Sequence, residues 1–290
     1  MRNRTSSIRS FLIISVVLFA ATWGIYANSL GNQFAFDDKS LIVENTFLSR
    51  GVSLARIFSS NYRAGAGFIG DGLYRPLVIL TYVWNKGETL SPLPFHLFNV
   101  TVNALNPVLL FLLIQGLTGN IIIAALTGIF FGFHPIHTEA VSNIAGRPGS
   151  VCCFFILASW IILERPRWRF PATFFGSVLF FAALLSKETA MVFPFMIIGA
   201  DVAMKRHLFS RNAIIKYVSL LCVLILYLVV RWKVLGPTAA GLDPTQLDNP
   251  IAHSPSIERI AVALGVFLRY LRLLVLPVSL SADYSYNQIP

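Results

Sequence analysis

Residues 10–28 read SFLIISVVLFAATWGIYAN, an apolar run without a charged side chain. A helix needs about 20 mostly apolar residues to cross the hydrocarbon core of a bilayer, and this run has that length. Ile25 and Ala27 make a poor small-x-small cleavage site. We therefore interpret the run as an uncleaved first membrane span and not as a signal peptide.

Similar apolar runs recur along the rest of the chain. Hydrophobic residues make up 56% of the 290 residues and charged residues 12%, and the mean hydropathy is +0.69. This composition excludes an ordinary water-soluble domain, and no strand-like alternation suggests a membrane barrel. We predict an all-α polytopic transmembrane bundle of about seven or eight spans. The predicted spans lie near residues 10–28, 95–115, 120–134, 148–164, 170–186, 189–204, 213–232 and 258–277.

The chain is predicted to form one membrane domain over residues 1–290. After the first span, residues 29–94 form a long external loop in which LARIFSSNYRAG and LVILTYVWN are candidates for interfacial helices. Residues 95–290 supply the remaining spans. Because the sequence stops at LSADYSYNQIP without a further span or a polar tail, we expect it to be truncated at its C-terminus.

Basic residues gather at three places that the predicted spans put on one side of the membrane. These clusters are Arg2, Arg4 and Arg9; Arg165, Arg167 and Arg169; and Lys205, Arg206, Arg211 and Lys216. The positive-inside rule then predicts a cytoplasmic N-terminus and an outward loop over 29–94. Outward means the periplasm or cell exterior, or the lumen of the endoplasmic reticulum. The net charge of +10 lies beside the apolar runs, so we predict no nucleic-acid partner.

The outward loop carries two adjacent carboxylates, Asp37 and Asp38, in FAFDDKSLIVEN at residues 34–45. Neighbouring carboxylates in a desolvated site can split their pKa values, which leaves one of them as a general base near neutral pH. The alternative is a turn or a helix cap, because Asp favours both.

Three further outward segments carry polar groups: YRP at 74–76, HPIHTEAVSNIAGRPGS at 134–150, and SKET at 186–189. Arg75, Arg147 and Lys187 can together hold a phosphate or pyrophosphate, and the alternative for each is snorkelling to the interface. His134, His137 and Glu139 have the residue types of a metal site, but Pro135 interrupts any helix between the histidines. A hydrogen-bonded substrate wall or a structural cap is the better interpretation of these three.

The last apolar run carries Arg269 and Arg272, which are spaced i, i+3 and so share one helical face. Either this helix lies partly in the membrane interface, or its arginines face a polar cavity.

Six segments resemble the family of transmembrane and tetratricopeptide-repeat-containing O-mannosyltransferases and its prokaryotic relatives. They are FAFDDKSLIVEN, YRPLVILTYVWN, PFHLFNVTVNAL, HPIHTEAVSNIAGRPGSVCCFFIL, LLSKETAMVFPFMIIGAD and LRLLVLPVSLSADYSY, in this order along nearly the whole chain. These proteins are similar to GT-C glycosyltransferases. The family's 34-residue helical repeat pattern is not found in these residues.

The resemblance implies an enzyme that transfers a sugar, mannose in this family, from a polyprenyl- or dolichyl-phosphate donor to a protein hydroxyl. Its partners are the lipid bilayer, the lipid-linked sugar and an acceptor protein; no cofactor is assigned, and a divalent metal is an open alternative without assigned ligands. Asp37 and Asp38 match the acidic pair, with Asp37 the better candidate for the catalytic base. The family's other external polar positions are matched by Arg75, His134, His137, Glu139, Arg147, Lys187 and Glu188. The alternatives from other classes are a transporter or flippase and a non-catalytic membrane scaffold.

Overall fold

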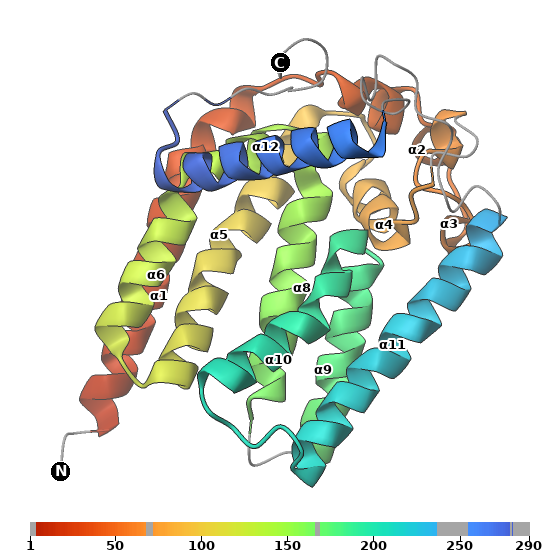
Figure 1. Ribbon diagram of the computed structural model, residues 1–290. Coiled ribbons are helices and arrows are strands. Elements are labelled where there is room, and N and C mark those ends of the chain that lie inside the picture. Colours follow the sequence, from red (N-terminus) through yellow and green to blue (C-terminus); the bar gives the residue numbers. More distant parts are fainter. Residues whose placement is uncertain (1–3, 68–71, 166–168, 237–254, 279, 281–290) are drawn as a thin grey trace.

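The computed structural model describes residues 4–67, 72–165, 169–236, 255–278 and 280. Within these residues the chain is helical and no strand is found, which confirms the all-α prediction. Long helices run up and down between two ends of the molecule, and a group of shorter helices covers the upper end (Figure 1). Of the residues in the predicted basic clusters, Arg2 and Arg167 lie outside the described part, as do the side chains of Arg4 and Arg169.

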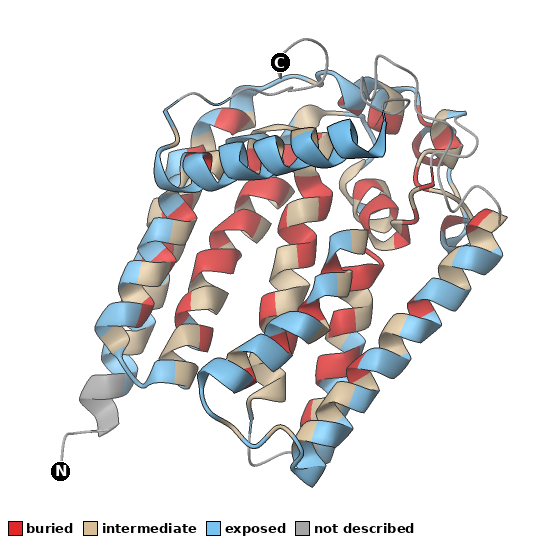
Figure 2. Ribbon diagram, in the orientation of Figure 1, coloured by how far each residue is buried: buried red, intermediate tan, exposed pale blue. Residues whose placement is uncertain are grey.

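Seven helices build the upright bundle, and the chain enters it from the lower end (Figure 1). They are α1 (Arg4–Tyr26), α5 (Pro92–Thr118), α6 (Ile121–Phe133), α8 (Arg147–Leu163), α9 (Arg169–Leu184), α10 (Phe193–Ala203) and α11 (Arg211–Leu235). Their inward faces hold most of the buried residues, and the outward faces of α1 and α11 are largely exposed (Figure 2). A bundle with apolar outward faces is the arrangement expected of a membrane protein.

Four helices in the described residues are long and apolar enough to cross a membrane: Ile8–Gly31, Pro92–Thr118, Ile144–Leu163 and Arg211–Leu235. A fifth results if Ile121–Phe133 and Pro135–Ser142, bent by 45° at their break, count as one span. The prediction of seven or eight spans is therefore not confirmed.

The predicted span at 189–204 is divided between the 3-10 helix η6 (Glu188–Val192) and α10, which has 11 residues. A helix of that length rises about 16 Å, about half the thickness of a hydrocarbon core. The predicted span at 258–277 is the amphipathic helix α12 (Ser256–Val275), which lies across the upper end of the bundle (Figure 1). Apolar composition alone does not distinguish these two segments from spanning helices.

The predicted external loop folds into a compact cap on the upper end. Its helical elements are η1 (Ala27–Gly31), η2 (Lys39–Val43), α2 (Thr46–Ser49), α3 (Leu54–Phe58), η3 (Ala64–Ala66) and α4 (Pro76–Asn85). A buried apolar cluster joins these elements, η1 excepted, to α5 through Ile42, Leu48, Val78 and Phe95. The face of α4 that carries Val78 is thus buried in the cap core. Its other side is partly exposed, with Trp84 74% exposed, so a position of α4 in the membrane interface stays a prediction.

Two small residues let α1, α5 and α6 approach closely inside the bundle. A Cβ added at Gly132 of α6 would lie 2.6 Å from the Thr22 hydroxyl of α1 and 3.1 Å from the Pro107 ring of α5. At Gly128, the Pro107 carbonyl oxygen would be 3.1 Å away. Glycine is favoured at such crossings because it lets helix backbones meet.

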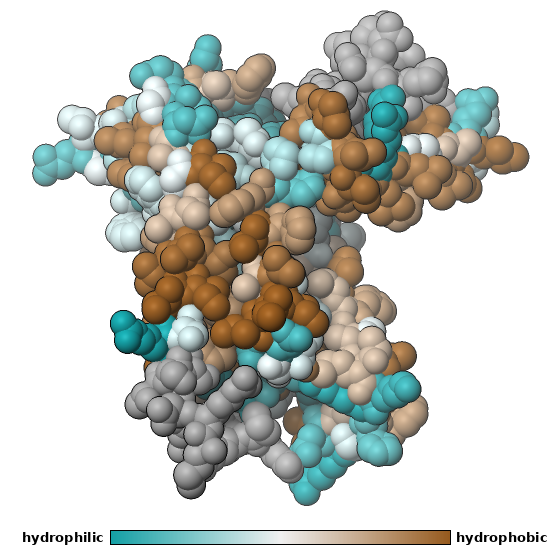
Figure 3. All heavy atoms as spheres, turned by 90° about the vertical axis from the view of Figure 1, so that its left-hand side faces the viewer, coloured by the Kyte–Doolittle hydropathy of each residue, from teal (hydrophilic) through white to brown (hydrophobic). Residues whose placement is uncertain are grey.

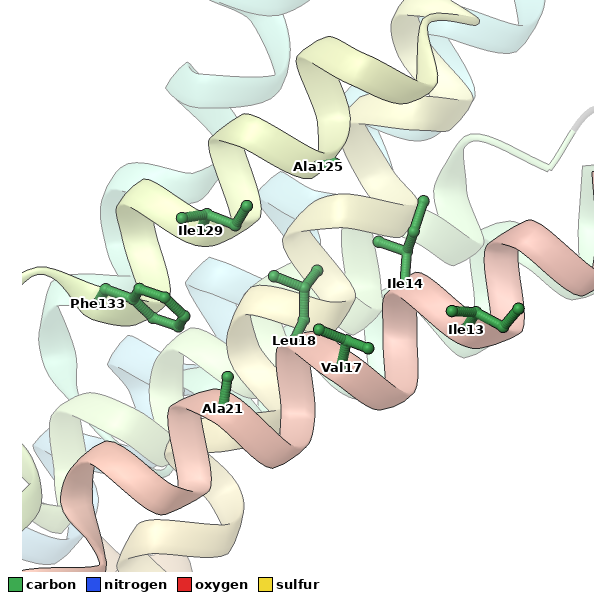
Figure 4. A pocket seen from close by; sticks show the side chains of 8 residues that line it. All are labelled: Ile13, Ile14, Val17, Leu18, Ala21, Ala125, Ile129 and Phe133. Atoms are coloured by element: carbon green, nitrogen blue, oxygen red, sulfur yellow. The ribbon is translucent and has the colours of Figure 1, made fainter.

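The outer surface between α1 and α6 holds an apolar groove of about 330 Å³. Figure 4 shows its lining, which comes from one face of each helix. The residues are Ile13, Ile14, Val17, Leu18 and Ala21 of α1, and Ala125, Ile129 and Phe133 of α6. Figure 3 shows brown, apolar side chains across the middle of this side of the molecule, with hydrophilic residues above and below them. This belt is where a bilayer would contact the bundle.

The lower end of the bundle is held by an ion-pair network centred on Asp201 of α10. The buried Asp201 carboxylate accepts hydrogen bonds from Lys216 Nζ at 2.6 Å, Arg206 Nη1 at 2.8 Å and the Tyr217 hydroxyl at 2.7 Å. Arg206 also pairs with Glu164 at the end of α8, at 2.8 Å. Two residues of the third basic cluster therefore fasten α8, α10 and α11 together at the end where the chain begins.

Candidate functional site

The polar residues selected from the sequence lie at the upper end of the bundle, opposite the Asp201 network. Asp37 and Asp38 precede η2, Arg75 precedes α4, and Glu188 begins η6. The 134–147 segment joins α6 to α8 through η4 (Pro135–His137), α7 (Thr138–Ser142) and η5 (Ile144–Gly146). The predicted residues thus share one end but fall into separate groups with different surroundings.

Asp38 is buried, with 1% of its surface exposed. Its carboxylate accepts hydrogen bonds from the backbone N–H of Ala35 at 3.1 Å and of Ala145 at 2.9 Å. Burial raises the pKa of Asp38, as does the neighbouring Asp37, and the backbone N–H donors offset this shift in part. Asp38 therefore joins the acidic motif to η5, 107 residues further along the chain.

Asp37 stands at the surface, with 56% of its side chain exposed. Its Oδ2 accepts a hydrogen bond from Arg63 Nη2 at 3.0 Å. The preceding residue, Phe36, has a φ of 46°, in the left-handed region that is uncommon for a large side chain. The strained turn at Phe36 presents one carboxylate to solvent and buries the next. Asp37 is thus the member of the pair that a substrate can reach.

Arg147 has no exposed surface. Its guanidinium donates to Asn99 Oδ1 at 2.7 Å, Asn85 Oδ1 at 2.7 Å, Thr81 Oγ1 at 2.9 Å and the Phe95 carbonyl at 2.9 Å. Its Cζ also lies 4.6 Å from the centroid of the Tyr82 ring. The phosphate contact predicted for Arg147 is therefore corrected: this residue joins α4, α5 and α8, and protein groups occupy its donors.

Asn99 of α5 and Tyr82 of α4 complete the frame around Arg147. The Asn99 amide donates to the carbonyls of Val141 at 3.3 Å and Asn143 at 3.2 Å. The Tyr82 hydroxyl donates to the Ile144 carbonyl at 3.2 Å and lies 3.2 Å from the Tyr62 hydroxyl. Sequence reasoning missed Asn99 and Tyr82. Asn99 could have been noticed as an amide within an apolar run that reads as a span.

The backbone before Arg147 is packed too closely for a side chain at Gly146. A Cβ there would lie 2.7 Å from the Glu139 carbonyl oxygen and 2.8 Å from the Ala140 Cα. Both are backbone atoms that cannot move aside as a side chain can. Glycine at this position thus lets η5 fold back on α7 and direct the Ala145 N–H at Asp38.

Arg75 and Glu188 form a second polar centre, joining the cap to η6. Arg75 Nε lies 3.0 Å from Glu188 Oε2, and Arg75 Nη2 lies 2.6 Å from Oε1, which is a bidentate pair. The two side chains are 13% and 29% exposed. Burial alone would raise the pKa of Glu188, but the hydrogen bonds and charge of Arg75 outweigh it and lower that pKa.

The lowered pKa of Glu188 gives a prediction on stability. A carboxyl whose pKa is lower in the folded state stabilises that state above its unfolded pKa of about 4.3, and this contribution is lost as the pH falls through the folded pKa. Glu188→Gln should lower the free energy of unfolding by about 1.5 to 3 kcal/mol at pH 7. Detergent unfolding curves at pH 7 and pH 3 measure this. A difference as large at pH 3 as at pH 7 would contradict the ion-pair explanation.

Lys187 lies beside the Arg75–Glu188 pair and is half-buried. Its Nζ is 3.8 Å from the point where a Cβ on Gly149 of α8 would be. Within the described part of the chain its ammonium forms no hydrogen bond or ion pair. Lys187 is thus a half-buried cation whose charge helps to lower the pKa of Glu188, while its ammonium forms no direct pair among the described residues and can contact a ligand.

The His134 and His137 rings lie next to each other, with centroids 6.3 Å apart, but each makes further contacts of its own. His134 Nδ1 accepts from the Ile136 N–H at 3.2 Å, which caps η4, and its Nε2 lies 3.1 Å from the Leu274 carbonyl oxygen of α12. The His137 ring packs on Phe131 with centroids 4.6 Å apart, and Glu139 is exposed on α7. No group of three His, Cys, Asp or Glu side chains in the described residues is placed to hold a metal ion. The cap predicted as one alternative for these residues is thus found at His134.

Comparison with curated proteins finds relatives along the whole chain. The chain is 31% identical over 288 residues to protein O-mannosyl-transferase Tmtc2 of Drosophila melanogaster, covering 92% of this chain and 30% of the fly protein. It is 30% identical over 295 residues to a Caenorhabditis elegans protein O-mannosyl-transferase, covering 99% and 41% of the two chains. Human protein O-mannosyl-transferase TMTC1 is 31% identical over 194 residues, or 61% and 22% of the two chains.

The chain thus spans less than half the length of the first two of these relatives. No family model matches the sequence, and no solved structure matches it.

Proposed function

Because the chain belongs to the TMTC family of protein O-mannosyl-transferases, we propose that it is the sugar-transferring membrane part of such an enzyme. It transfers mannose from a polyprenyl- or dolichyl-phosphate donor to a hydroxyl of a protein acceptor, on a GT-C-type bundle. The observation that carries the proposal is the exposed Asp37 carboxylate at the same end of the bundle as the available ammonium of Lys187. A general base and a cation for a phosphate are the two groups that this reaction requires.

In the proposed step, Asp37 accepts the proton of the acceptor hydroxyl while the hydroxyl oxygen attacks the anomeric carbon of the sugar. The bond from that carbon to the phosphate oxygen breaks, and Lys187 stabilises the negative charge of the departing lipid phosphate. Asp38 is a positioning residue, because its carboxylate is buried and bonded to two backbone N–H groups. Arg75 and Glu188 fix the segment that carries Lys187 against the cap.

Transfer in proteoliposomes tests the function directly. The purified chain is reconstituted with polyprenyl-phosphate mannose labelled in the sugar and with a peptide rich in Ser and Thr. Labelled peptide that depends on the chain is the expected result. Movement of the labelled lipid between leaflets without labelled peptide would instead favour the flippase alternative, and neither signal would favour a scaffold.

The contribution of Lys187 can be measured as donor affinity. Lys187→Ala should weaken donor binding by about 10- to 100-fold, since hydrogen bonds to charged groups contribute about 1.5 to 3 kcal/mol, while acceptor affinity stays the same. Lys187→Arg should restore part of the loss, because it keeps the charge and changes the geometry. Lys205→Ala, an exposed lysine at the opposite end, is the matched control. Unchanged donor affinity in Lys187→Ala would move the phosphate site elsewhere.

We also propose that the upper end faces outward and the lower end faces the cytoplasm. The Asp201 network and the exposed Lys205 lie at the end where α1 begins, and the acidic pair lies at the other. Single cysteines introduced as Lys205→Cys and Ser59→Cys, both at exposed positions, report on the two ends. An impermeant thiol reagent added outside should label the cysteine at 59, whereas labelling at 205 with none at 59 would reverse the topology.

A further inference from the structure

Helix α12 carries a surface that the proposed sugar transfer does not explain. Its 20 residues, Ser256–Val275, lie across the upper end of the bundle and cross the directions of α5 and α8 (Figure 1). Among the described long helices it does not qualify as a membrane span. Its position and composition therefore need another explanation.

One side of α12 is a continuous apolar stripe. Its members recur at the i, i+3, i+4 and i+7 spacing of one helical face. They are Ile257, Ile260, Leu264, Phe267, Leu268, Leu271, Leu274 and Val275, with exposed fractions from 44% at Leu271 to 82% at Ile257. Monomeric soluble proteins rarely leave such a stripe in water, so it marks a contact surface.

The opposite side of α12 faces the protein. Leu273 is buried, and Val262 and Val266 are half-buried, all about half a helical turn away from Leu264. The helix is also fastened at its C-terminal end, where the Leu274 carbonyl oxygen lies 3.1 Å from His134 Nε2. The exposed stripe is therefore a fixed feature of the fold and points away from the bundle.

The charges of α12 lie off the stripe and are mostly positive. The helix carries three positively charged residues, Arg259, Arg269 and Arg272, and one negatively charged residue, Glu258. Arg259 lies roughly 140° around the helix from Leu264, and Arg272 about 80° from it. An apolar face bounded by arginines is the pattern of a helix that lies in a membrane interface and meets lipid phosphates.

The level of α12 on the molecule agrees with a position in the interface. The helix lies where α6 ends and η4 begins, at the upper limit of the apolar belt. In Figure 3 the upper part of the molecule overhangs on the side where α12 lies, and the lower surface of this overhang is brown. A bilayer around the belt would meet this apolar surface from below.

We infer that α12 is an interfacial helix that docks on the same bilayer that the bundle crosses. Its stripe enters the boundary between headgroups and acyl chains, to a depth of about 5 to 10 Å, and its arginines contact lipid phosphates. The stripe lies at the upper limit of the apolar belt, and arginines flank it. A bilayer is therefore a better partner for the stripe than a second copy of the chain. The inference does not depend on the sugar transfer.

Depth-dependent fluorescence quenching tests this inference on the full chain. The native cysteines Cys152, Cys153 and Cys222 are first replaced by alanine. An environment-sensitive NBD label is then attached to Leu264→Cys on the stripe or to Glu258→Cys off it, with one copy of the chain in each nanodisc. The nanodiscs contain phosphatidylcholine and phosphatidylglycerol, with a nitroxide at a shallow or a deep acyl position.

The label at 264 should emit at shorter wavelength than the label at 258, and the shallow nitroxide should quench it several-fold more than the deep one. The label at 258 should remain water-like. Strongest quenching by the deep nitroxide would overturn the inference in favour of a spanning helix. A blue-shifted label at 264 that no lipid nitroxide quenches would show that protein covers the stripe. A water-like label at both positions would also overturn it. A label at Phe267→Cys repeats the measurement where Leu264→Cys fails to fold.

Discussion

Replacement of Asp37 by asparagine is expected to lower the rate of sugar transfer by about 10²- to 10⁴-fold, the usual contribution of a positioned general base. Asparagine keeps the size of the side chain and removes its basicity. Asp37 has 56% of its side chain exposed, and within the described residues its carboxylate accepts one hydrogen bond, from Arg63. Folding and donor binding should therefore survive the change. Turnover in proteoliposomes at matched protein amounts, together with donor affinity, measures the effect.

Asp38→Asn serves as the comparison for this prediction. The Asp38 carboxylate accepts two backbone N–H groups, and an amide can accept with one atom only. Asp38→Asn should thus reduce stability as well as turnover, whereas Asp37→Asn should reduce turnover alone. Near-normal transfer by Asp37→Asn would assign the base to Asp38 or reduce the pair to a structural turn. Normal transfer by the double variant Asp37→Asn, Asp38→Asn would rule out a general base at this pair.

Arg147→Met is expected to destabilise the fold by about 3 to 5 kcal/mol, because it leaves four buried or half-buried acceptors without their donor. The acceptors come from α4 and α5: Thr81, Asn85, the Phe95 carbonyl and Asn99. Methionine fills much of the same volume, so the loss measures the hydrogen bonds more than a cavity. The free energy of unfolding from a denaturing-detergent titration is the measurement.

Two variants make the result for Arg147 specific. Arg165→Met removes an exposed arginine at the opposite end and should change stability by less than about 0.5 kcal/mol. Arg147→Lys keeps the charge but not the planar fork of donors, and should fall between wild type and Arg147→Met. A loss below about 1 kcal/mol in Arg147→Met would contradict the structural role and reopen the question of a ligand at this residue.

The sequence was sufficient to predict the helical class and the end of the molecule at which the candidate residues gather. The length of the apolar runs predicts helices. The basic clusters predict which ends of these helices lie on the same side of the membrane. The number of spans predicted by the same reasoning is not confirmed, since four or five helices among the described residues are long and apolar enough to cross a membrane. A run such as FPFMIIGADVA in α10 has the composition of a span, and composition does not show where the helix begins.

The roles of the individual cations could not be read from the sequence. Arg75, Arg147 and Lys187 are alike as basic residues at the outward ends of apolar runs. Their difference depends on partners far along the chain: Glu188 is 113 residues from Arg75, and Asn99 is 48 residues from Arg147. Lys187 has no such partner among the described residues. Burial and pairing of this kind arise from tertiary packing, which a single sequence does not record.

The hydrogen bonds that hold Asp38 in place bear on the activation entropy of the proposed sugar transfer. Asp38 is fixed by the Ala145 N–H, and the segment that bears Ala145 is fixed in turn by Asn99 and Tyr82. These contacts form when the chain folds. The entropy lost in ordering these groups is therefore lost during folding and not when the substrate binds. The protein dipoles around Asp37 then need to reorient little as the transition state forms. The activation entropy of transfer should consequently reflect the movements of acceptor and donor rather than of the protein around Asp37.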